Sequence, residues 1–140
     1  MGKIKYDLII IGAGPAGLSA SLYASRYGIK QVVFGIIPGG LISATHQMDN
    51  YLGLEEISGF EFGQKIIQHV KKYGVEIISE EVKEVIKQKK QFLVKTNKKR
   101  AYLSKTIILA MGTQRRKMNI ENEDKFYGKG ISYCATCDGF

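Results

Sequence analysis

The feature that most constrains the fold lies near the amino terminus, where an apolar run leads directly into three closely spaced glycines. Residues 6–11 read YDLIII, which is typical of a parallel strand buried on both faces. GAGPAG follows, and then LSASLYASRYG, which predicts a helix that ends near Gly28. Residues 30–35, KQVVFG, predict a second strand. This order predicts one right-handed β-α-β crossover.

The glycines of this crossover predict a ligand. Gly12, Gly14 and Gly17 form G-x-G-x-x-G between the strand and the helix. The first glycine permits a tight turn, the second lets backbone approach a pyrophosphate, and the third lets helix and strand pack closely. The helix N-terminus offers free N–H groups and a partial positive charge to phosphates. The acidic residue expected about twenty positions later is missing, since Gly35 and Ile36 stand there, and ordinary NAD binding is therefore disfavoured.

The rest of the chain predicts further elements around this crossover. Residues 36–59 lack a period and predict a long loop with room for one helical turn, and such loops are usually functional. Residues 59–74 predict an amphipathic helix and residues 75–79 a strand. VKEVIK, QFLVKT and AYLSK predict a short antiparallel meander, and TIILAMG (106–112) predicts another buried parallel strand. The expected fold is α/β and Rossmann-like: a parallel sheet with helices plus a small antiparallel β-meander.

Composition narrows the class of protein. Lys and Arg number 21 against 13 Asp and Glu, which gives a net charge of +8, concentrated in residues 87–100 and 114–117. A solvated basic hairpin explains this charge better than a nucleic-acid site, because no aromatic stacking pattern accompanies it. No apolar run reaches the ~18 residues that span a bilayer, and the start does not resemble a secretory signal. A soluble cytoplasmic protein without a membrane partner is expected.

The chain ends in YCATCDGF, where Cys134 and Cys137 form C-x-x-C and Asp138 follows. A dithiol/disulfide couple is favoured, because it suits a chain that also binds a dinucleotide. A zinc half-site would need two further ligands, and His46 and His69 lack the partner spacing, so no metal is predicted. Inert thiols are the third alternative. Asp138 could exchange protons with a thiol, although spacing alone favours a solvated or helix-capping aspartate.

With GAGPAG and CATCDG both in view, the chain resembles the low-molecular-weight thioredoxin reductases over essentially its whole length. These flavoproteins pass electrons from NADPH through FAD to a dithiol and on to thioredoxin. GGLISATHQMDNYLG (39–53) resembles their GGQL-to-N-(W/Y)-P-G segment, and LAMG resembles their A-T-G turn. Their FAD fingerprint commonly lacks the acidic ribose partner. The resemblance implies FAD as cofactor, NADPH as electron donor in the complete enzyme and a thioredoxin-like partner, with homodimerisation left open.

The resemblance also assigns roles to residues. Cys134 would exchange with thioredoxin, Cys137 would face the flavin, and Asp138 would be the acid/base. Leu41 stands where the family has Gln, so one polar flavin contact is expected to be lost. The residues expected to bind FAD are Gly12, Gly14, Pro15, Ala16, Gly17, Gly35, Gly39, Gly40, Leu41, Thr45, Asn50, Val82, Ala110 and Gly112.

Domain boundaries follow from the same resemblance. Residues 1–113 would be the N-terminal segment of an incomplete FAD-binding domain, 114–117 a hinge, and 118–140 the start of an NADPH domain whose nucleotide site is absent. We therefore expect little or no reductase turnover from these 140 residues alone. The alternative is a non-catalytic FAD- or nucleotide-binding module with vestigial cysteines.

Overall fold

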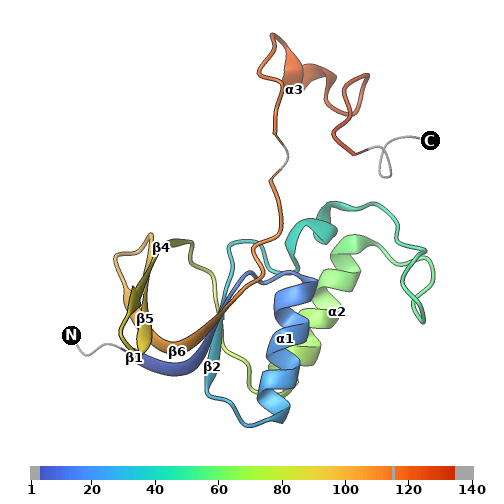
Figure 1. Cartoon of the computed structure of the whole chain (residues 1–140). Helices are drawn as coiled ribbons and strands as arrows, with labels where there is room; N and C mark the ends of the chain where they lie inside the picture. Colours follow the sequence, from blue (N-terminus) through green and yellow to red (C-terminus); the bar gives the residue numbers. More distant parts are fainter. Residues whose placement is uncertain (1–3, 115, 135–140) are drawn as a thin grey trace.

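A computed structural model describes residues 4–114 and 116–134. It has one six-stranded sheet in the order β3-β2-β1-β6-β5-β4 (Figure 1). The strands are β1 (Ile4–Ile11), β2 (Gln31–Phe34), β3 (Ile77–Ile78), β4 (Val82–Gln88), β5 (Gln91–Thr96) and β6 (Ala101–Leu109). The sheet is mixed, because β1 pairs in parallel with β2 and β6, β2 pairs in parallel with β3, and the β4-β5-β6 meander is antiparallel.

Two helices connect the parallel strands. Helix α1 (Pro15–Arg26) joins β1 to β2, and α2 (Gly59–Lys72) joins the loop after β2 to β3. Both lie on the same face of the sheet (Figure 1). Gly28 follows α1 with φ +68°, a left-handed conformation typical of a helix end. The predicted Rossmann-like β-α-β crossover is confirmed.

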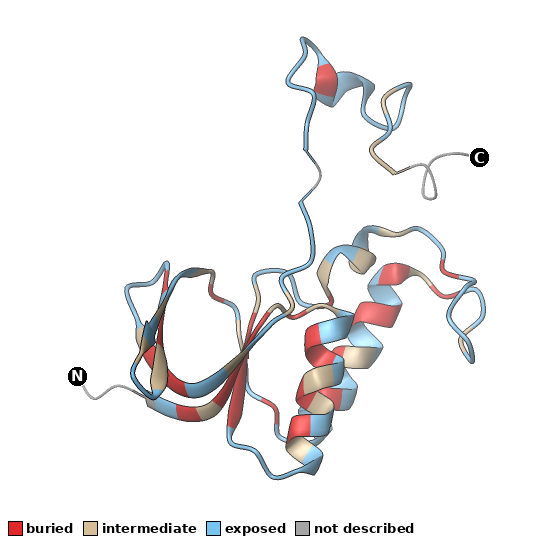
Figure 2. Ribbon diagram, in the orientation of Figure 1, coloured by how far each residue is buried: buried red, intermediate tan, exposed pale blue. Residues whose placement is uncertain are grey.

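The core has two parts because alternate residues of β1 and β2 point to opposite faces of the sheet. On the helix face, Ile10 and Val33 pack with residues of α1 and α2 such as Leu18 and Ile67. On the other face, the sheet curls so that Tyr102 reaches Phe34, with ring centroids 4.9 Å apart. Figure 2 shows the resulting run of buried residues through the middle of the sheet. Burial on both faces agrees with the continuous apolar sequence of β1.

The structure corrects the prediction for residues 101–112. The two segments predicted there as separate strands are one strand, β6, which pairs with β5 on one side and β1 on the other. The expectation of burial on both faces is also wrong for its carboxyl end, where Leu109 is 61% exposed. Among the described residues, the buried clusters take in Ile107 of this segment as a partly buried neighbour but neither Ile108 nor Leu109.

The long loop after β2 is more ordered than predicted. It contains one short 3-10 helix, η1 (Gly40–Ala44). Beyond η1, isolated bridges pair Met48 with Ile57 and Tyr51 with Leu54. Met48 and Ile57 are buried against Phe62 of α2, so this apolar cluster holds the loop on the helix.

The last described segment runs away from the sheet and contains α3 (Glu123–Phe126) (Figure 1). Its described residues form a polar network of their own. The Tyr133 hydroxyl donates to the Glu123 carboxylate and accepts from the Met118 N–H at 2.9 Å. The hydrogen bond from Tyr133 is the main cause that lowers the pKa of Glu123. In the part of the chain described, no helix is both long and apolar enough to cross a bilayer.

Candidate dinucleotide-binding site

A cavity of about 570 Å³ opens at the carboxyl ends of β1, β2 and β6. In open α/β sheets this edge is where ligands bind. Four segments far apart in sequence line the cavity: residues 11–16, residues 34–37 together with 40–42, residues 80–82, and residues 110–114. Of the residues predicted to bind a cofactor, ten line it: Gly12, Gly14, Pro15, Ala16, Gly35, Gly40, Leu41, Val82, Ala110 and Gly112.

Two glycines of the G-x-G-x-x-G loop are required by packing within the protein. Gly12 has φ +122°, and a Cβ there would overlap the carbonyl group of Ala110. A Cβ on Gly17 would overlap the carbonyl oxygen of Gly12. The Gly12 N–H donates to the carbonyl of Phe34 at 2.7 Å, so the loop is fixed to the end of β2. Close packing of helix on strand, predicted for Gly17, is present.

Gly14 is different, because the protein itself leaves room for a side chain. A Cβ there would meet only the Cα of Gly40, at 3.7 Å, which is ordinary van der Waals contact. Its backbone is extended, with φ −83° and ψ −178°, so no left-handed conformation requires glycine. A side chain at this position would stand beside the cavity that Gly14 lines. The missing side chain therefore fits a ligand that approaches the backbone.

The N-terminus of α1 adds the electrostatic part of the site. No side chain caps it, and no acidic residue lies in its first turn. Pro15 stands at the first position of the helix, where its lack of an N–H costs nothing. The N–H groups and partial positive charge at such a helix start favour an anion. Together with Gly14, this geometry fits a pyrophosphate.

The end of β2 explains why no acidic side chain follows the loop. A Cβ on Gly35 would lie 2.5 Å from the Cβ of Ala13, so any larger residue would displace the glycine loop. Ile36 and Ile37 come next, each 58% exposed. This part of the cavity is thus apolar, without a carboxylate from β2 to hold a ribose hydroxyl.

The cavity is also lined by residues 80–82, here called the 80–82 wall. Sequence reasoning identified Val82 there but missed Glu80 and Glu81. Glu80 is buried, and Glu81 makes an ion pair with Lys83 at 2.6 Å. Two adjacent acids directly after a strand were the available signal. Other lining residues missed are Ile11, Ala13, Phe34, Ile36, Ile37, Ile42, Met111, Thr113 and Gln114.

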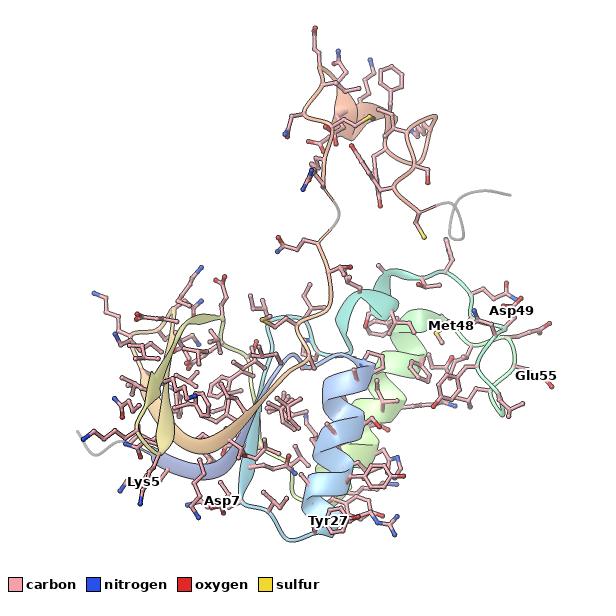
Figure 3. The ribbon with its side chains drawn as sticks, viewed as in Figure 1. Lys5, Asp7, Tyr27, Met48, Asp49 and Glu55 are labelled. Atoms are coloured by element: carbon pink, nitrogen blue, oxygen red, sulfur yellow. The ribbon has the colours of Figure 1, made fainter. Side chains whose placement is uncertain are left out.

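Four predicted cofactor residues do not line the cavity. Gly17 and Gly39 pack within the protein instead: a Cβ on Gly17 would overlap the Gly12 carbonyl, and one on Gly39 would lie 3.0 Å from the Cα of Gly63 in α2. Thr45 ends η1, and its carbonyl accepts from the Gly59 N–H at 3.0 Å. Asn50 is exposed on the loop beyond η1. Figure 3 shows its neighbours Met48 and Asp49 on that loop, beside the start of α2.

The predicted redox residues lie at the end of the chain. Cys134 is disulfide-bonded and does not line the cavity. Cys137 and Asp138 lie outside the described residues. Within residues 4–114 and 116–134, no group of three His, Cys, Asp or Glu side chains could hold a metal ion.

The sequence profile of the family described as "Pyridine nucleotide-disulphide oxidoreductase" matches residues 6–140. Two curated relatives are thioredoxin reductases. That of Bacillus subtilis (strain 168) is 42% identical over 135 residues, which are 96% of this chain and 42% of the relative. That of Ureaplasma parvum is 43% identical over 140 residues, 99% of this chain and 45% of the relative. The chain thus spans less than half the length of these relatives.

Solved structures give the same picture. A thioredoxin reductase from Streptococcus pyogenes superimposes with a TM-score of 0.85 at 35% identity, covering 99% of this chain and 45% of its own. One from Lactococcus lactis gives 0.82 at 34% identity, with 96% and 44% covered. A ferredoxin-flavin thioredoxin reductase from Clostridium acetobutylicum gives 0.75 at 37% identity, with 96% and 46% covered.

Proposed function

The chain belongs to the pyridine nucleotide-disulphide oxidoreductase family, and on this premise we propose that it is the FAD-binding part of a thioredoxin-disulfide reductase. Electrons from NADPH would pass by way of FAD to the Cys134/Cys137 dithiol and on to thioredoxin or a thioredoxin-like protein. The curated relatives support the choice of reaction. The observation that carries the proposal is the free space beside Gly14. The described residues leave room there for a side chain, so packing within the protein does not explain why this residue is glycine.

The chain's own residues would bind and orient the cofactor. When bound, FAD supplies the two-electron chemistry, and the protein supplies binding and position. The N–H groups at the start of α1 would hold its pyrophosphate. Four apolar side chains that line the cavity are more than half exposed, and a planar aromatic ligand would remove their surface from water. They are Ile36, Ile37, Leu41 and Met111.

The dithiol step is proposed from the C-x-x-C spacing and from the relatives. The Cys134 thiolate attacks the disulfide of the partner, forming a mixed disulfide and releasing one partner thiolate. Cys137 then attacks the sulfur of Cys134, which releases the second partner thiolate and leaves the pair oxidised. Two electrons thereby reach the partner, and Asp138 would supply and accept the protons.

The cofactor part is tested by titrating the chain with FAD. We expect one FAD per chain and the absorption spectrum of a protein-bound oxidised flavin. Gly14→Ala should lower the FAD affinity at least tenfold, because its methyl group would stand where the pyrophosphate approaches. Its far-UV circular dichroism should match the wild type. Failure of the wild type to bind FAD, or equal affinity in both proteins, would contradict the proposal.

A reductive titration separates the dithiol function from a non-catalytic flavin module with vestigial cysteines. With FAD bound, dithionite should deliver two electrons to the flavin and two more to the disulfide in the wild type. Cys134→Ser should take up only the two flavin electrons. Vestigial cysteines that exchange no electrons with the flavin predict that the wild type, like Cys134→Ser, takes up only the two flavin electrons. Adding NADPH or a reduced ferredoxin to the complete protein then identifies the electron donor.

A further inference from the structure

A second cavity, of about 420 Å³, shares no lining residue with the dinucleotide site. The charged side chains that line it are four lysines and one aspartate, and they come from four segments of the chain. They are Lys5 and Asp7 of β1 (labelled in Figure 3), Lys30 before β2, Lys90 between β4 and β5, and Lys105 of β6. The described lining therefore carries a net charge of +3 at pH 7.

The one acid among these lining residues is already engaged. Asp7 Oδ1 lies 2.6 Å from Lys105 Nζ, and the Asp7 N–H donates to the Lys30 carbonyl at 2.8 Å. The hydrogen bond with Lys105 is the main cause that lowers the pKa of Asp7, and the charge of Lys30 lowers it further. Asp7 thus stays ionised and balances the charge of one lysine, while three lysines remain.

Lys5, Lys30 and Lys90 form no ion pair in the part of the chain that the structure describes. Lys30 instead places its Nζ 5.8 Å from the centroid of the Tyr6 ring, and the Tyr6 hydroxyl donates to Glu76 at 2.8 Å. Glu76 itself does not line the cavity. Like charges around a concave surface repel one another and focus a positive potential into it. An anion that entered the cavity would relieve this repulsion.

From this arrangement we infer that the cavity binds a small phosphate-bearing anion with several negative charges. A lysine ammonium is a compact point charge with three donors, which suits phosphate oxygens, whereas planar pairing with a carboxylate is typical of arginine. The described lining contains lysines and no arginine. A free oligophosphate and the phosphate chain of a nucleotide share this chemistry. The site lies apart from the dinucleotide cavity, so the inference goes beyond the proposed function and does not depend on it.

The shape of the charged region favours a small anion over a nucleic acid. Of the basic residues in the run 87–100, only Lys90 lines the cavity, and the other three lysines of the lining come from β1, β6 and the residue before β2. A nucleic acid would instead follow a basic groove or face along its backbone. The lysines gathered here surround a volume of about 420 Å³, which matches a ligand of a few phosphate groups.

Isothermal titration with inorganic tripolyphosphate tests the site, in about 0.15 M salt and with saturating FAD to occupy the glycine loop. We expect one tripolyphosphate per chain. The double variant Lys30→Gln/Lys90→Gln should lower the affinity at least about tenfold, because it removes two charged hydrogen-bond donors. Lys98→Gln/Lys99→Gln is the matched control. It removes the same charge from exposed lysines that do not line the cavity, and the affinity should stay within about twofold of the wild type.

Asp7→Asn should change the affinity in the opposite direction. It removes the acid of the lining and frees Lys105, so tripolyphosphate should bind about threefold more tightly. Asp49→Asn alters an exposed acid on the loop after η1, changes the net charge equally and should leave the affinity unchanged. ATP then distinguishes the two sources of phosphate. Tighter binding of ATP identifies a nucleotide as the ligand, and tighter binding of tripolyphosphate identifies a free oligophosphate.

Far-UV circular dichroism like that of the wild type shows that a variant is folded. No binding of tripolyphosphate up to about 1 mM would overturn the inference, as would equal affinities of Lys30→Gln/Lys90→Gln and its control. Binding that disappears when FAD is added would place the anion at the glycine loop and also overturn it. Tighter binding of a single-stranded oligonucleotide, weakened in Lys98→Gln/Lys99→Gln, would assign the basic charge to nucleic acid instead.

Discussion

Gly14 and Gly17 belong to the same loop but are glycines for different physical reasons. A Cβ on Gly17 would overlap the Gly12 carbonyl oxygen and lie 3.3 Å from Cγ2 of Ile10, so the backbone would have to move. We expect Gly17→Ala to lower the free energy of unfolding by about 1–3 kcal/mol, as overpacking does. Gly14→Ala should stay within about 0.5 kcal/mol of the wild type. Urea unfolding measures both, and equal midpoints for the two variants would contradict the packing role of Gly17.

Asp7 gives the chain an acid-sensitive contact. Its Oδ1 lies 2.6 Å from Lys105 Nζ, and this hydrogen bond is the main cause that lowers the pKa of Asp7. A lowered pKa contributes stability above the unfolded value of about 3.9, and that stability is lost as pH falls through the folded value. Asp7→Asn should therefore be slightly less stable than the wild type at pH 7 and indistinguishable at the acid end.

Urea midpoints of the two proteins between about pH 7 and pH 2 measure this difference, and added salt should reduce it because the pair is exposed. FAD affinity is the control. Figure 3 labels Lys5 and Asp7, which lie in the amino-terminal half of β1, whereas the cavity lies at its carboxyl end, so Asp7→Asn should bind FAD like the wild type. A difference that persists at the lowest pH would contradict the assignment to Asp7.

At the scale of helices and strands, the sequence predicts those elements that a local residue pattern determines. The β1-α1-β2 crossover is readable because apolar runs, a glycine loop and a helix-ending glycine all agree. The sequence does not predict the full length of β6, because the exposed Lys105 and Thr106 in its middle suggest a break between two strands. Strand β5 pairs only with residues 101–104 of β6, and pairing with β1 up to Leu109 carries the strand through this polar step. The position of Asn50 was equally unreadable, since tertiary contacts of Met48 and Ile57 with α2 decide it.

Helix α2 depends on a local signal whose contribution can be measured. Ser58 caps it, because its Oγ accepts from the Glu61 N–H at 3.1 Å. Ser58→Ala should lower the free energy of unfolding by about 1 kcal/mol, the usual loss for such a cap. Ser19→Ala is the control, as it alters an exposed serine within α1 and should stay within about 0.5 kcal/mol. Equal urea midpoints for these two variants would show that Ser58 does not support the helix.

At the scale of the whole molecule, the candidate site joins segments of the chain that no local sequence pattern predicts to be neighbours in space. The glycine loop identifies one of them, since its spacing between strand and helix is specific. The sequence does not identify the 80–82 wall in this way, because the burial of Glu80 depends on its hydrogen bond with Thr96 and its ion pair with Arg100. Those partners lie in another hairpin, and the sequence of two acids followed by valine reads equally well as a solvated turn.

Because FAD would bridge these segments only in the folded state, its binding should stabilise the whole chain. At a free FAD concentration about one hundred times the Kd, mass action predicts about 2.7 kcal/mol of added stability. For a chain of 140 residues this corresponds to a rise in Tm of roughly 10 °C. Differential scanning calorimetry measures the rise, and FMN, which lacks the pyrophosphate and adenosine, should produce a much smaller one. Amide hydrogen exchange should slow with FAD at residues 12–16 and 80–82 together, since both line the cavity. Protection of the glycine loop without the 80–82 wall would mean that the ligand's pyrophosphate binds while its adenosine does not reach the wall.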